Sequence, residues 1–219
     1  MTRGQPLAVG VLASGRGSNL QALLEACASP GFPARIALVI SDKEQAQALE
    51  RARACGVEAL WINPKDFADR ESFDAALVRE FQARNVGLVC HAGFMRIQSE
   101  AFAARWLGRQ LNIHPSLLPA FKGLHPHKQA LDAGVRISGC TVHFVTPELD
   151  SGPVVAQAAV AVHEGDTPET LGDRILVAEH RLYPFALRLV ASGSARLENG
   201  RVMFKSSINQ ANFLFSPMP

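Results

Sequence analysis

This sequence is poor in the features that mark secreted, zinc-binding or membrane proteins. It has four cysteines, which form neither a Cys-x-x-Cys pair nor the Cys/His spacing of a zinc site: Cys27, Cys55, Cys90 and Cys140. Each cysteine falls within an apolar stretch, which predicts buried, reduced thiols in a cytoplasmic protein. We therefore expect neither disulfides nor a structural metal.

Charge excess and long hydrophobic runs are also lacking. The net charge is +2 and 19% of the residues are charged, so nothing favours nucleic acid or an anionic membrane as a partner. The first 13 residues weakly resemble a signal peptide, but Gly15, Arg16 and Asn19 interrupt the apolar run. No other stretch approaches the ~20 apolar residues that span a bilayer. A local anion site remains compatible with this composition.

The first half of the chain alternates strand-like and helix-like segments. Short apolar runs predict strands over four ranges: 7–13, 35–40, 59–62 and 86–92. Three helices are expected between these strands. Apolar residues at helical spacing after Asn19 predict the first, and the segment 46–55, with Gly56 as its C-terminal cap, predicts the second. The apolar stripe of Phe73, Leu77 and Phe81 predicts the third. This β-α-β order predicts an α/β fold with an open, mainly parallel twisted sheet and helices on both faces.

The second half changes character. After the strand that carries Asn112 and His114 comes a loop over 115–126. We then expect these elements: a short helix at 128–133, adjacent strands at 139–145 and 154–162, and a helix from Thr167-Pro168 to about 190. Asn199-Gly200 predicts a C-terminal hairpin between 195–198 and 201–205. No linker or repeat separates the halves, so one continuous sheet is expected.

The segment from Arg109 to Pro119 contains Asn112-Ile113-His114-Pro115. Asn112 and His114 would share one face of a strand, and Pro115 would end it, because proline cannot donate to a sheet ladder. An amide and an imidazole would then sit where open α/β sheets place their ligand crevices. An imidazole can move a proton near neutral pH, and an amide can anchor a carbonyl. The alternative is a strand that happens to end in this way.

The segment Ser14-Gly-Arg-Gly-Ser-Asn19 follows the first predicted strand and opens the first helix. Glycines let the backbone approach a ligand, and free N–H groups at a helix start attract phosphate. Leu20 stands at the third glycine position of a dinucleotide fingerprint, and the Gly-Lys-Ser/Thr ending of a P-loop is missing. A monophosphate therefore fits better than a dinucleotide, although a tight turn without a ligand is the alternative.

Asp150 is the third candidate, 36 positions after His114, in a loop bounded by proline and glycine. A carboxylate close to a histidine favours the charged imidazolium, and the two groups could then stabilise an oxyanion and move a proton. The alternative is an exposed loop aspartate. Three further candidates are weaker. His125-Pro-His127 lacks metal-site geometry, Cys90-His91 reads as the end of a buried strand, and Arg70 and Arg96 are either anion anchors or surface residues.

Together, these segments resemble the folate-dependent phosphoribosylglycinamide formyltransferases. The matching pieces run in order through the chain: Ser-Gly-Arg-Gly-Ser-Asn (14–19), Ala-Gly-Phe-Met-Arg-Ile (92–97), Leu-Asn-Ile-His-Pro-Ser-Leu-Leu-Pro (111–119), Gly-Leu-His (123–125) and Val-His-Phe-Val-Thr-Pro-Glu-Leu-Asp-Ser-Gly-Pro (142–153). The resemblance implies a single formyltransferase domain over 1–219. Its Rossmann-like half (1–107) would bind phosphate, and its other half (108–219) would hold the catalytic and folate-binding residues.

The resemblance also implies transfer of the formyl group of 10-formyltetrahydrofolate to the amine of 5-phosphoribosylglycinamide, in de novo purine biosynthesis. Asn112, His114 and Asp150 would be catalytic, without a metal. Gly17, Ser18, Asn19 and Glu179 would hold the ribonucleotide. The folate would contact these residues: Arg70, Met95, Arg96, Ile97, Gln98, Asn112, Thr146, Pro147, Glu148, Leu149 and Asp150. A monomer or homodimer in the cytoplasm, with no nucleic-acid or membrane partner, is expected.

Two positions depart from the family pattern. Leu176 stands where a polar, phosphate-facing side chain is usual, and Gln98 stands where an aliphatic residue commonly lines the pterin pocket. Competing classes fit less well. Methionyl-tRNA formyltransferases usually add a basic RNA-binding domain, and formyltetrahydrofolate deformylases usually add an N-terminal module. A nicotinamide oxidoreductase would need the missing glycine, and a nucleotide-binding module would leave the second half unexplained.

Overall fold

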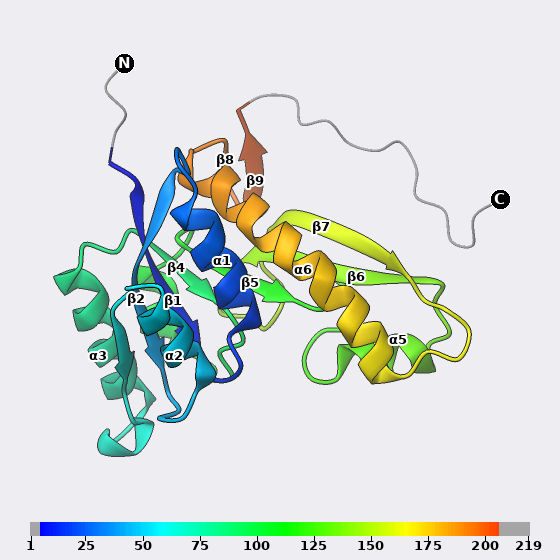
Figure 1. Cartoon of the computed structure of the whole chain (residues 1–219), viewed down its shortest axis with the longest axis horizontal. Coiled ribbons are helices and arrows are strands. Elements are labelled where there is room, and N and C mark those ends of the chain that lie inside the picture. The colour runs from blue at the N-terminus through cyan, green and yellow to red at the C-terminus, as the bar shows by residue number, and fades with distance from the viewer. Residues whose placement is uncertain (1–4, 206–219) are drawn as a thin grey trace.

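A seven-stranded sheet runs through the computed structural model, which describes residues 5–205 (Figure 1). Its strand order is β3-β2-β1-β4-β5-β6-β7. The bounds are β1 (Leu7–Ala13), β2 (Ala34–Ser41), β3 (Ala59–Trp61), β4 (Leu88–His91), β5 (Gln110–His114), β6 (Ile137–Phe144) and β7 (Val154–Ala161). The first five strands in this order pair in parallel, and β6 and β7 join antiparallel. The predicted mainly parallel, continuous sheet is confirmed. Both ends of the predicted 1–219 domain lie outside the described residues.

Helices cover both faces of the sheet, as predicted (Figure 1). Their bounds are α1 (Ser18–Ala28), α2 (Gln47–Ala54), α3 (Arg70–Ala83), α4 (Glu100–Arg105), α5 (Pro126–Asp132) and α6 (Pro168–Ala191). One apolar core joins the sheet to α1, α2 and α6, and the other joins it to α3 and α4. Between residues 5 and 205, no helix is long and apolar enough to cross a membrane.

Several local sequence signals act as predicted. Gly56 has φ +70° just after α2, a conformation that ends helices and that suits glycine. Thr167 caps α6 by accepting from the Thr170 backbone N–H, and Pro168 occupies the first helical position. Asn199 and Gly200 both have positive φ, as a type I′ turn requires. They connect β8 (Ala195–Glu198) and β9 (Arg201–Phe204), a hairpin separate from the main sheet.

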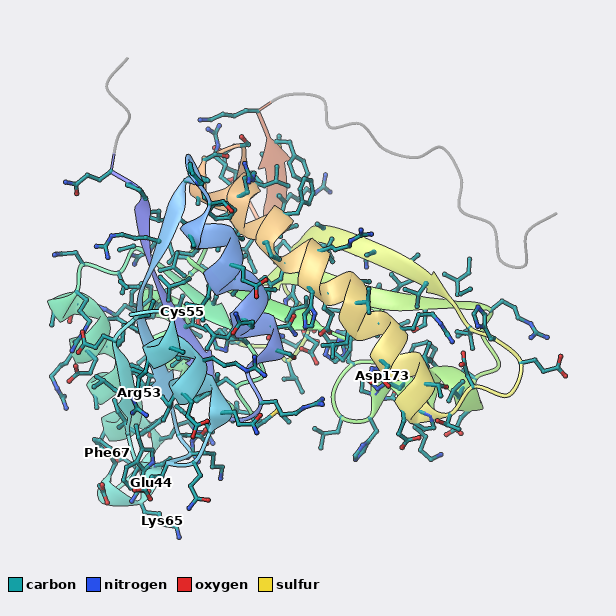
Figure 2. The ribbon with its side chains drawn as sticks, viewed as in Figure 1. Glu44, Arg53, Cys55, Lys65, Phe67 and Asp173 are labelled. Atoms are coloured by element: carbon teal, nitrogen blue, oxygen red, sulfur yellow. The ribbon has the colours of Figure 1, made fainter. Side chains whose placement is uncertain are left out.

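Three sequence expectations need correction. Helix α4 was not predicted, although the Ser99 hydroxyl caps it by accepting from the Phe102 backbone N–H. Helix α5 begins at Pro126 rather than 128, because proline suits the first turn of a helix. The expectation of four buried thiols is wrong for Cys55, which is exposed where α2 ends, and for Cys27, which is only half-buried (Figure 2). All four cysteines are unpaired.

The order of the strands reverses between β1 and β4, because the chain runs outward from β1 to β3 and then returns to the other side of β1. Ligand crevices of open α/β sheets form at such a point, beyond the carboxyl ends of the strands. The loops after β1 and β4 touch there. The Ser14 backbone N–H donates to the Gly93 carbonyl (3.1 Å), and the Met95 N–H donates to the Ser14 hydroxyl (3.0 Å).

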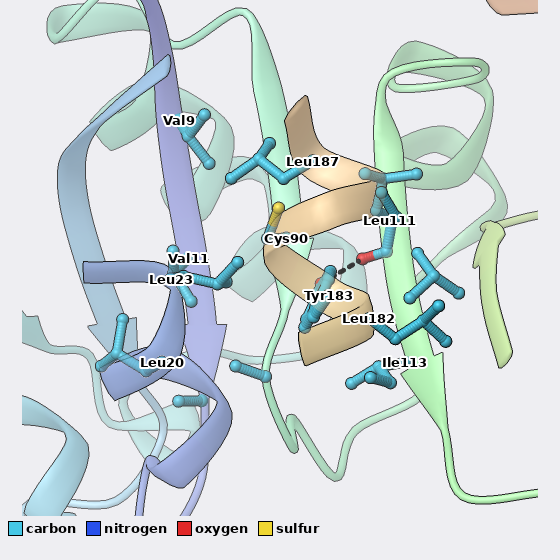
Figure 3. Close-up of a cluster of buried hydrophobic side chains, with 14 of the residues drawn as sticks. Val9, Val11, Leu20, Leu23, Cys90, Leu111, Ile113, Leu182, Tyr183 and Leu187 are labelled. Atoms are coloured by element: carbon cyan, nitrogen blue, oxygen red, sulfur yellow. Dashed lines mark hydrogen bonds between the residues drawn. The ribbon is translucent and has the colours of Figure 1, made fainter. Parts of the chain in front are cut away.

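Tyr183, the only tyrosine of the chain, connects α6 to β4 and β5 (Figure 3). Tyr183 is fully buried, and its hydroxyl lies 3.1 Å from the Leu111 carbonyl and 3.0 Å from the His91 carbonyl. Burial raises the pKa of the phenol well above its ordinary value, so the hydroxyl stays a donor. One side chain thus ties α6 to β4 and β5 near the ends that carry the candidate site.

The variant Tyr183→Phe removes this donor and leaves two buried carbonyls without it. We expect the free energy of unfolding to fall by about 1–3 kcal/mol in urea denaturation. Phe185→Leu on the same helix alters a side chain that is 46% exposed, so it should change the same quantity by no more than about 0.5 kcal/mol. Equal stabilities of the two variants would contradict the role given to the Tyr183 hydroxyl.

Candidate active site at the end of β5

Strand β5 presents two functional side chains on one face. Asn112 and His114 lie two residues apart and pair across the antiparallel ladder with His143 and Thr141 of β6. The strand ends at His114 because Pro115 has no N–H, and the Ser116 N–H instead donates back to the His114 carbonyl (2.9 Å). An amide and an imidazole therefore meet at the carboxyl end of the strand.

Asp150 reaches this end of β5 from the loop that connects β6 to β7. Its Oδ2 accepts from the Gly123 backbone N–H (2.9 Å) and lies 3.3 Å from His114 Nδ1. Its Oδ1 lies 3.8 Å from Nε2 of His143. The Asp150, His114 and His143 side chains are all buried. The proximity of Asp150 to His114, which the sequence left open, is thus present in the fold.

The hydrogen bonds assign the ring nitrogens. His114 Nε2 donates to the Phe121 carbonyl (2.9 Å), so both nitrogens of this ring face oxygen acceptors. His143 Nδ1 donates to the Phe144 carbonyl (2.9 Å), which leaves Nε2 as an acceptor for the Asn112 amide (3.2 Å). Burial lowers the pKa of His143, so its ring is neutral near pH 7. The Asn112 amide keeps a second N–H for a ligand.

Gly152 lets the loop that carries Asp150 fold back over β6. A Cβ at this position would lie 1.7 Å from the Phe144 carbonyl oxygen and 3.3 Å from His143 Nδ1. The Phe144 N–H bonds the Pro153 carbonyl beside it (2.9 Å). Asp150 itself has φ +48°, in the left-handed region. The backbone therefore sets the position of the carboxylate.

A cavity of about 120 Å³ opens on one side of this cluster. It brings together most of the residues predicted to contact folate: Arg96, Ile97, Gln98, Asn112 and the loop 146–150. Met95, which is 69% exposed, and Arg70, at the exposed start of α3, do not line it. Two residues that were not predicted to contact folate, His91 and His143, also line it. Of these, only His91 was weighed as a candidate in the sequence, as the end of a buried strand. Burial lowers the pKa of His91 to about 4, so the ring is neutral.

A second cavity, of about 550 Å³, lies beyond Pro115 and between the start of α1 and the start of α6. Ser18, Asn19 and Glu179, three of the four residues predicted to hold a ribonucleotide, line it. The fourth, Gly17, caps α1 with φ +71°, and a Cβ there would lie 2.8 Å from Ala48. Because Asn112 lines the first cavity and Pro115 the second, the end of β5 separates the two.

Glu179 is a buried carboxyl in the second cavity. Asn19 Nδ2 donates to its Oε2 at 2.7 Å. Burial raises the pKa of Glu179 to about 7 although this hydrogen bond opposes the shift. Near neutral pH the group is therefore divided between a carboxylate and a neutral acid, which can donate as well as accept a hydrogen bond.

His143 was not singled out by its position in the sequence, and His127 was weighed only as part of a weak metal candidate. His143 becomes part of the cluster only through the pairing of β6 with β5, which no short motif encodes. His127 lines the second cavity, whereas its neighbour His125 is exposed. In residues 5–205, no group of three or more His, Cys, Asp or Glu side chains is placed to hold a metal ion.

Comparison with known proteins points to one family. Residues 7–187 match the model described as formyl transferase. The phosphoribosylglycinamide formyltransferase of Escherichia coli (strain K12) is 44% identical over 187 residues, which cover 85% of this chain and 88% of that protein. A crystal structure of glycinamide ribonucleotide transformylase 1 from Symbiobacterium toebii superposes with a TM-score of 0.89 at 52% identity, covering 92% of this chain and 95% of that one.

Longer relatives contain a similar segment. The trifunctional purine biosynthetic protein adenosine-3 of Bos taurus is 50% identical over 195 residues, which cover 89% of this chain but 19% of that protein. The chain thus spans about a fifth or less of the trifunctional relatives it matches, and most of the bacterial ones. The similarity to the trifunctional proteins therefore concerns one segment of each.

Gly152→Ala tests whether the backbone places Asp150. The added methyl would collide with the Phe144 carbonyl, so we expect the loop to shift and the free energy of unfolding to fall by about 3 kcal/mol in urea denaturation. The ¹⁵N signals of the His114 ring should shift as well. Gly165→Ala meets no atom within 4 Å and should cost only about 1 kcal/mol of backbone strain. The proposed constraint would be wrong if Gly152→Ala, like the control Gly165→Ala, left the His114 signals unchanged.

Glu179→Gln tests the raised pKa through stability. Between its ordinary value of 4.5 and about 7, the folded protein retains a proton that the unfolded chain releases. Stability should therefore fall as the pH rises through this window and level off above it. The variant lacks this titration, so at pH 8 its free energy of unfolding should exceed that of the wild type by about 1–3 kcal/mol. Exposed Glu164→Gln should keep the wild-type profile, and an unchanged profile in Glu179→Gln would refute the assignment.

Proposed function

The chain belongs to the formyl transferase family, and we propose that it transfers the formyl group of 10-formyltetrahydrofolate to the amine of 5-phosphoribosylglycinamide. Formyl transfer to phosphoribosylglycinamide is the activity named for the bacterial relatives, and the longer relatives are named as purine biosynthetic proteins. The observation that carries the proposal is the meeting of Asn112, His114 and Asp150 at the end of β5, between two separate cavities. Two substrates that react with each other need adjacent binding sites that meet at the catalytic groups.

The acceptor would occupy the cavity between α1 and α6. Ser18 and Asn19 stand at the start of α1, where free N–H groups favour a phosphate, and Gly17 permits close backbone approach. Glu179 would bind the ribose or glycinamide part of the nucleotide as acceptor or donor, in keeping with its intermediate protonation. The glycinamide amine would then point toward β5 and His114.

The formyl donor would occupy the cavity beside the 146–150 loop. Its lining includes Ile97 and Leu149, which are more than half exposed and available to a pterin ring. Arg96 lies over the Phe73 ring at 5.2 Å, which leaves its guanidinium at the rim, where Arg70 could also meet a carboxylate tail. Gln98 places an amide in this lining, and its Nε2 is buried without a hydrogen-bond partner in residues 5–205. A pterin with polar edges supplies such a partner.

The chemistry follows from the atoms at the end of β5. The amine attacks the formyl carbon, a C–N bond forms, and negative charge grows on the formyl oxygen. The free N–H of Asn112 would stabilise that oxyanion, and so would a proton on His114 once its Nε2 leaves the Phe121 carbonyl. Such donors are worth about 3–4 kcal/mol each in other enzymes. Collapse breaks the bond to the folate nitrogen. The amine loses a proton and the folate nitrogen gains one, through His114 or water.

Asp150 would orient the His114 ring and balance its positive charge. Its carboxylate is fixed by the Gly123 N–H, and the neighbouring His143 is neutral, so a positive charge that develops on His114 during the reaction would pair with Asp150. The chemistry requires no metal. The four unpaired thiols support a reducing, cytoplasmic compartment. A monomer or a homodimer would serve equally, because one chain supplies both cavities.

One assay tests this function directly. The protein is mixed with 10-formyltetrahydrofolate, with or without phosphoribosylglycinamide, and folate release is followed by absorbance. Release that depends on the acceptor is expected. Release without the acceptor would instead identify a deformylase, and no release under either condition would refute the proposed transfer.

Asp150→Asn keeps the shape of the side chain and removes its charge. We expect a folded protein whose kcat falls by about 10²–10⁴, because His114 loses the partner of its positive charge. Asp132→Asn makes the same chemical change on the exposed end of α5, where Asp132 pairs with Lys128, and should leave kcat unchanged. Near-normal turnover in Asp150→Asn would remove the assigned role.

A further inference from the structure

The cavity between α1 and α6 has an unusual charge for a phosphate site. Three acidic side chains line it: Glu169, Asp173 and Glu179. Asp173 projects from the first turns of α6 (Figure 2). Among residues 5–205, Arg16 is the only arginine or lysine in the lining. A phosphomonoester carries about two negative charges near neutral pH, so this lining would repel it without a cation.

Two other positions in the lining, Leu176 and His127, supply no positive charge. Leu176 faces the cavity from α6 with an apolar side chain, at the position where the family resemblance predicts a polar one. His127 lines the cavity from α5, but burial lowers the pKa of its ring, which is therefore neutral near pH 7. The fixed positive charge of this cavity thus comes from Arg16.

Hydrogen bonds from α2 hold the backbone at Gly15 and Arg16 in place. Arg51 Nε donates to the Arg16 carbonyl (2.8 Å), and the Ala48 N–H donates to the Gly15 carbonyl (3.1 Å). On the other side, Gly17 packs directly against Ala48. Helix α2 therefore anchors the residues on both sides of Arg16. A side chain presented from a fixed backbone loses less entropy when it binds a ligand.

The guanidinium itself is free. In the described part of the chain, the Arg16 side chain forms no ion pair and no hydrogen bond, and it is exposed at the cavity. Two more polar atoms of this lining, Asn19 Oδ1 and His127 Nε2, are buried without a hydrogen-bond partner within residues 5–205. Unsatisfied polar atoms around an unpaired cation indicate a ligand that is both anionic and rich in hydrogen bonds.

We propose that Arg16 is the principal cation for the phosphate of the ribonucleotide, in the role that Leu176 on α6 cannot fill. The guanidinium would bind phosphate oxygens from the outer side, while the N–H groups at the start of α1 bind them from the inner side. Arg16 is a binding residue in this proposal and takes no part in formyl transfer. The inference rests on the proposed function for the identity of the nucleotide.

The first test is the variant Arg16→Gln in steady-state kinetics. The KM for phosphoribosylglycinamide should rise about 10- to 100-fold, whereas kcat and the KM for 10-formyltetrahydrofolate should stay within about twofold, because only ground-state binding of one substrate is lost. Arg53→Gln removes the same charge from an exposed site on α2 outside the cavity (Figure 2), and should change none of the three.

A rescue variant separates charge from loop structure. Leu176→Lys in the Arg16→Gln background returns a cation to the same cavity from α6, and should recover most of the lost affinity. Arg16→Lys should retain most of it directly. The dephosphorylated nucleoside should have the same KM with the wild type and Arg16→Gln. The proposal would be overturned, in favour of a structural role for Arg16, by either of two results. In the first, Leu176→Lys fails to restore the affinity that Arg16→Gln loses; in the second, Arg16→Gln weakens binding of the nucleoside as much as binding of the nucleotide.

Binding without turnover keeps the two proposals distinguishable. Thermal unfolding is measured with phosphoribosylglycinamide alone, which should raise the Tm of the wild type much more than that of Arg16→Gln at the same concentration. If the nucleotide shifts the Tm of the wild type but not that of Arg16→Gln, and the wild type transfers no formyl group, the binding role of Arg16 is supported and the proposed transferase activity is refuted. Transfer by the wild type with unchanged KM and Tm shift in Arg16→Gln would refute Arg16 alone. No Tm shift and no transfer with the wild type would overturn both.

Discussion

The site depends on one buried carboxylate held between two imidazoles. Asp150 enters from a loop with its φ in the left-handed region, accepts from the Gly123 N–H, and faces His114 and His143. A buried charge is costly unless it is paired and hydrogen-bonded, so loop, strand and carboxylate must fit together at once. The steric limit at Gly152 and the neutral state of His143 both serve this arrangement. The positions of the other site residues, His114 and His143, depend on this carboxylate.

The sheet changes direction at the same place. Strands β1 to β5 run in parallel, which brings their carboxyl ends together, and the antiparallel β6 then returns beside β5 with His143 and Thr141. The start of α1 and the 146–150 loop consequently line two cavities on opposite sides of the end of β5. Tyr183 holds α6 against this region, and the same helix carries Glu179 into the cavity between α1 and α6. Fold and site are thus joined through short, buried contacts.

Most elements of the fold could be predicted because their signals are local. Gly56, Pro168 and the Asn199-Gly200 turn set element ends through backbone conformation, and apolar periodicity marked the strands. The errors have local causes too. The short helix α4 has too few residues for a periodic pattern, and Cys55 lies in an apolar stretch that nevertheless turns toward solvent at a helix end. Burial depends on what packs over a segment, which a linear pattern does not contain.

The sequence by itself determined the side chains available and their local geometry: an amide and an imidazole on one strand face, a proline that ends the strand, and a glycine loop that opens a helix. Tertiary structure alone decided which distant groups met them. It placed Asp150 at 3.3 Å from His114 and made His143 the partner of Asn112. It also left Arg16 as the single fixed cation that the described part of the chain supplies to a cavity lined by acids. The reason is physical: strand propensity and turn chemistry act over a few residues, whereas distances, burial and protonation arise from packing between segments far apart in the chain.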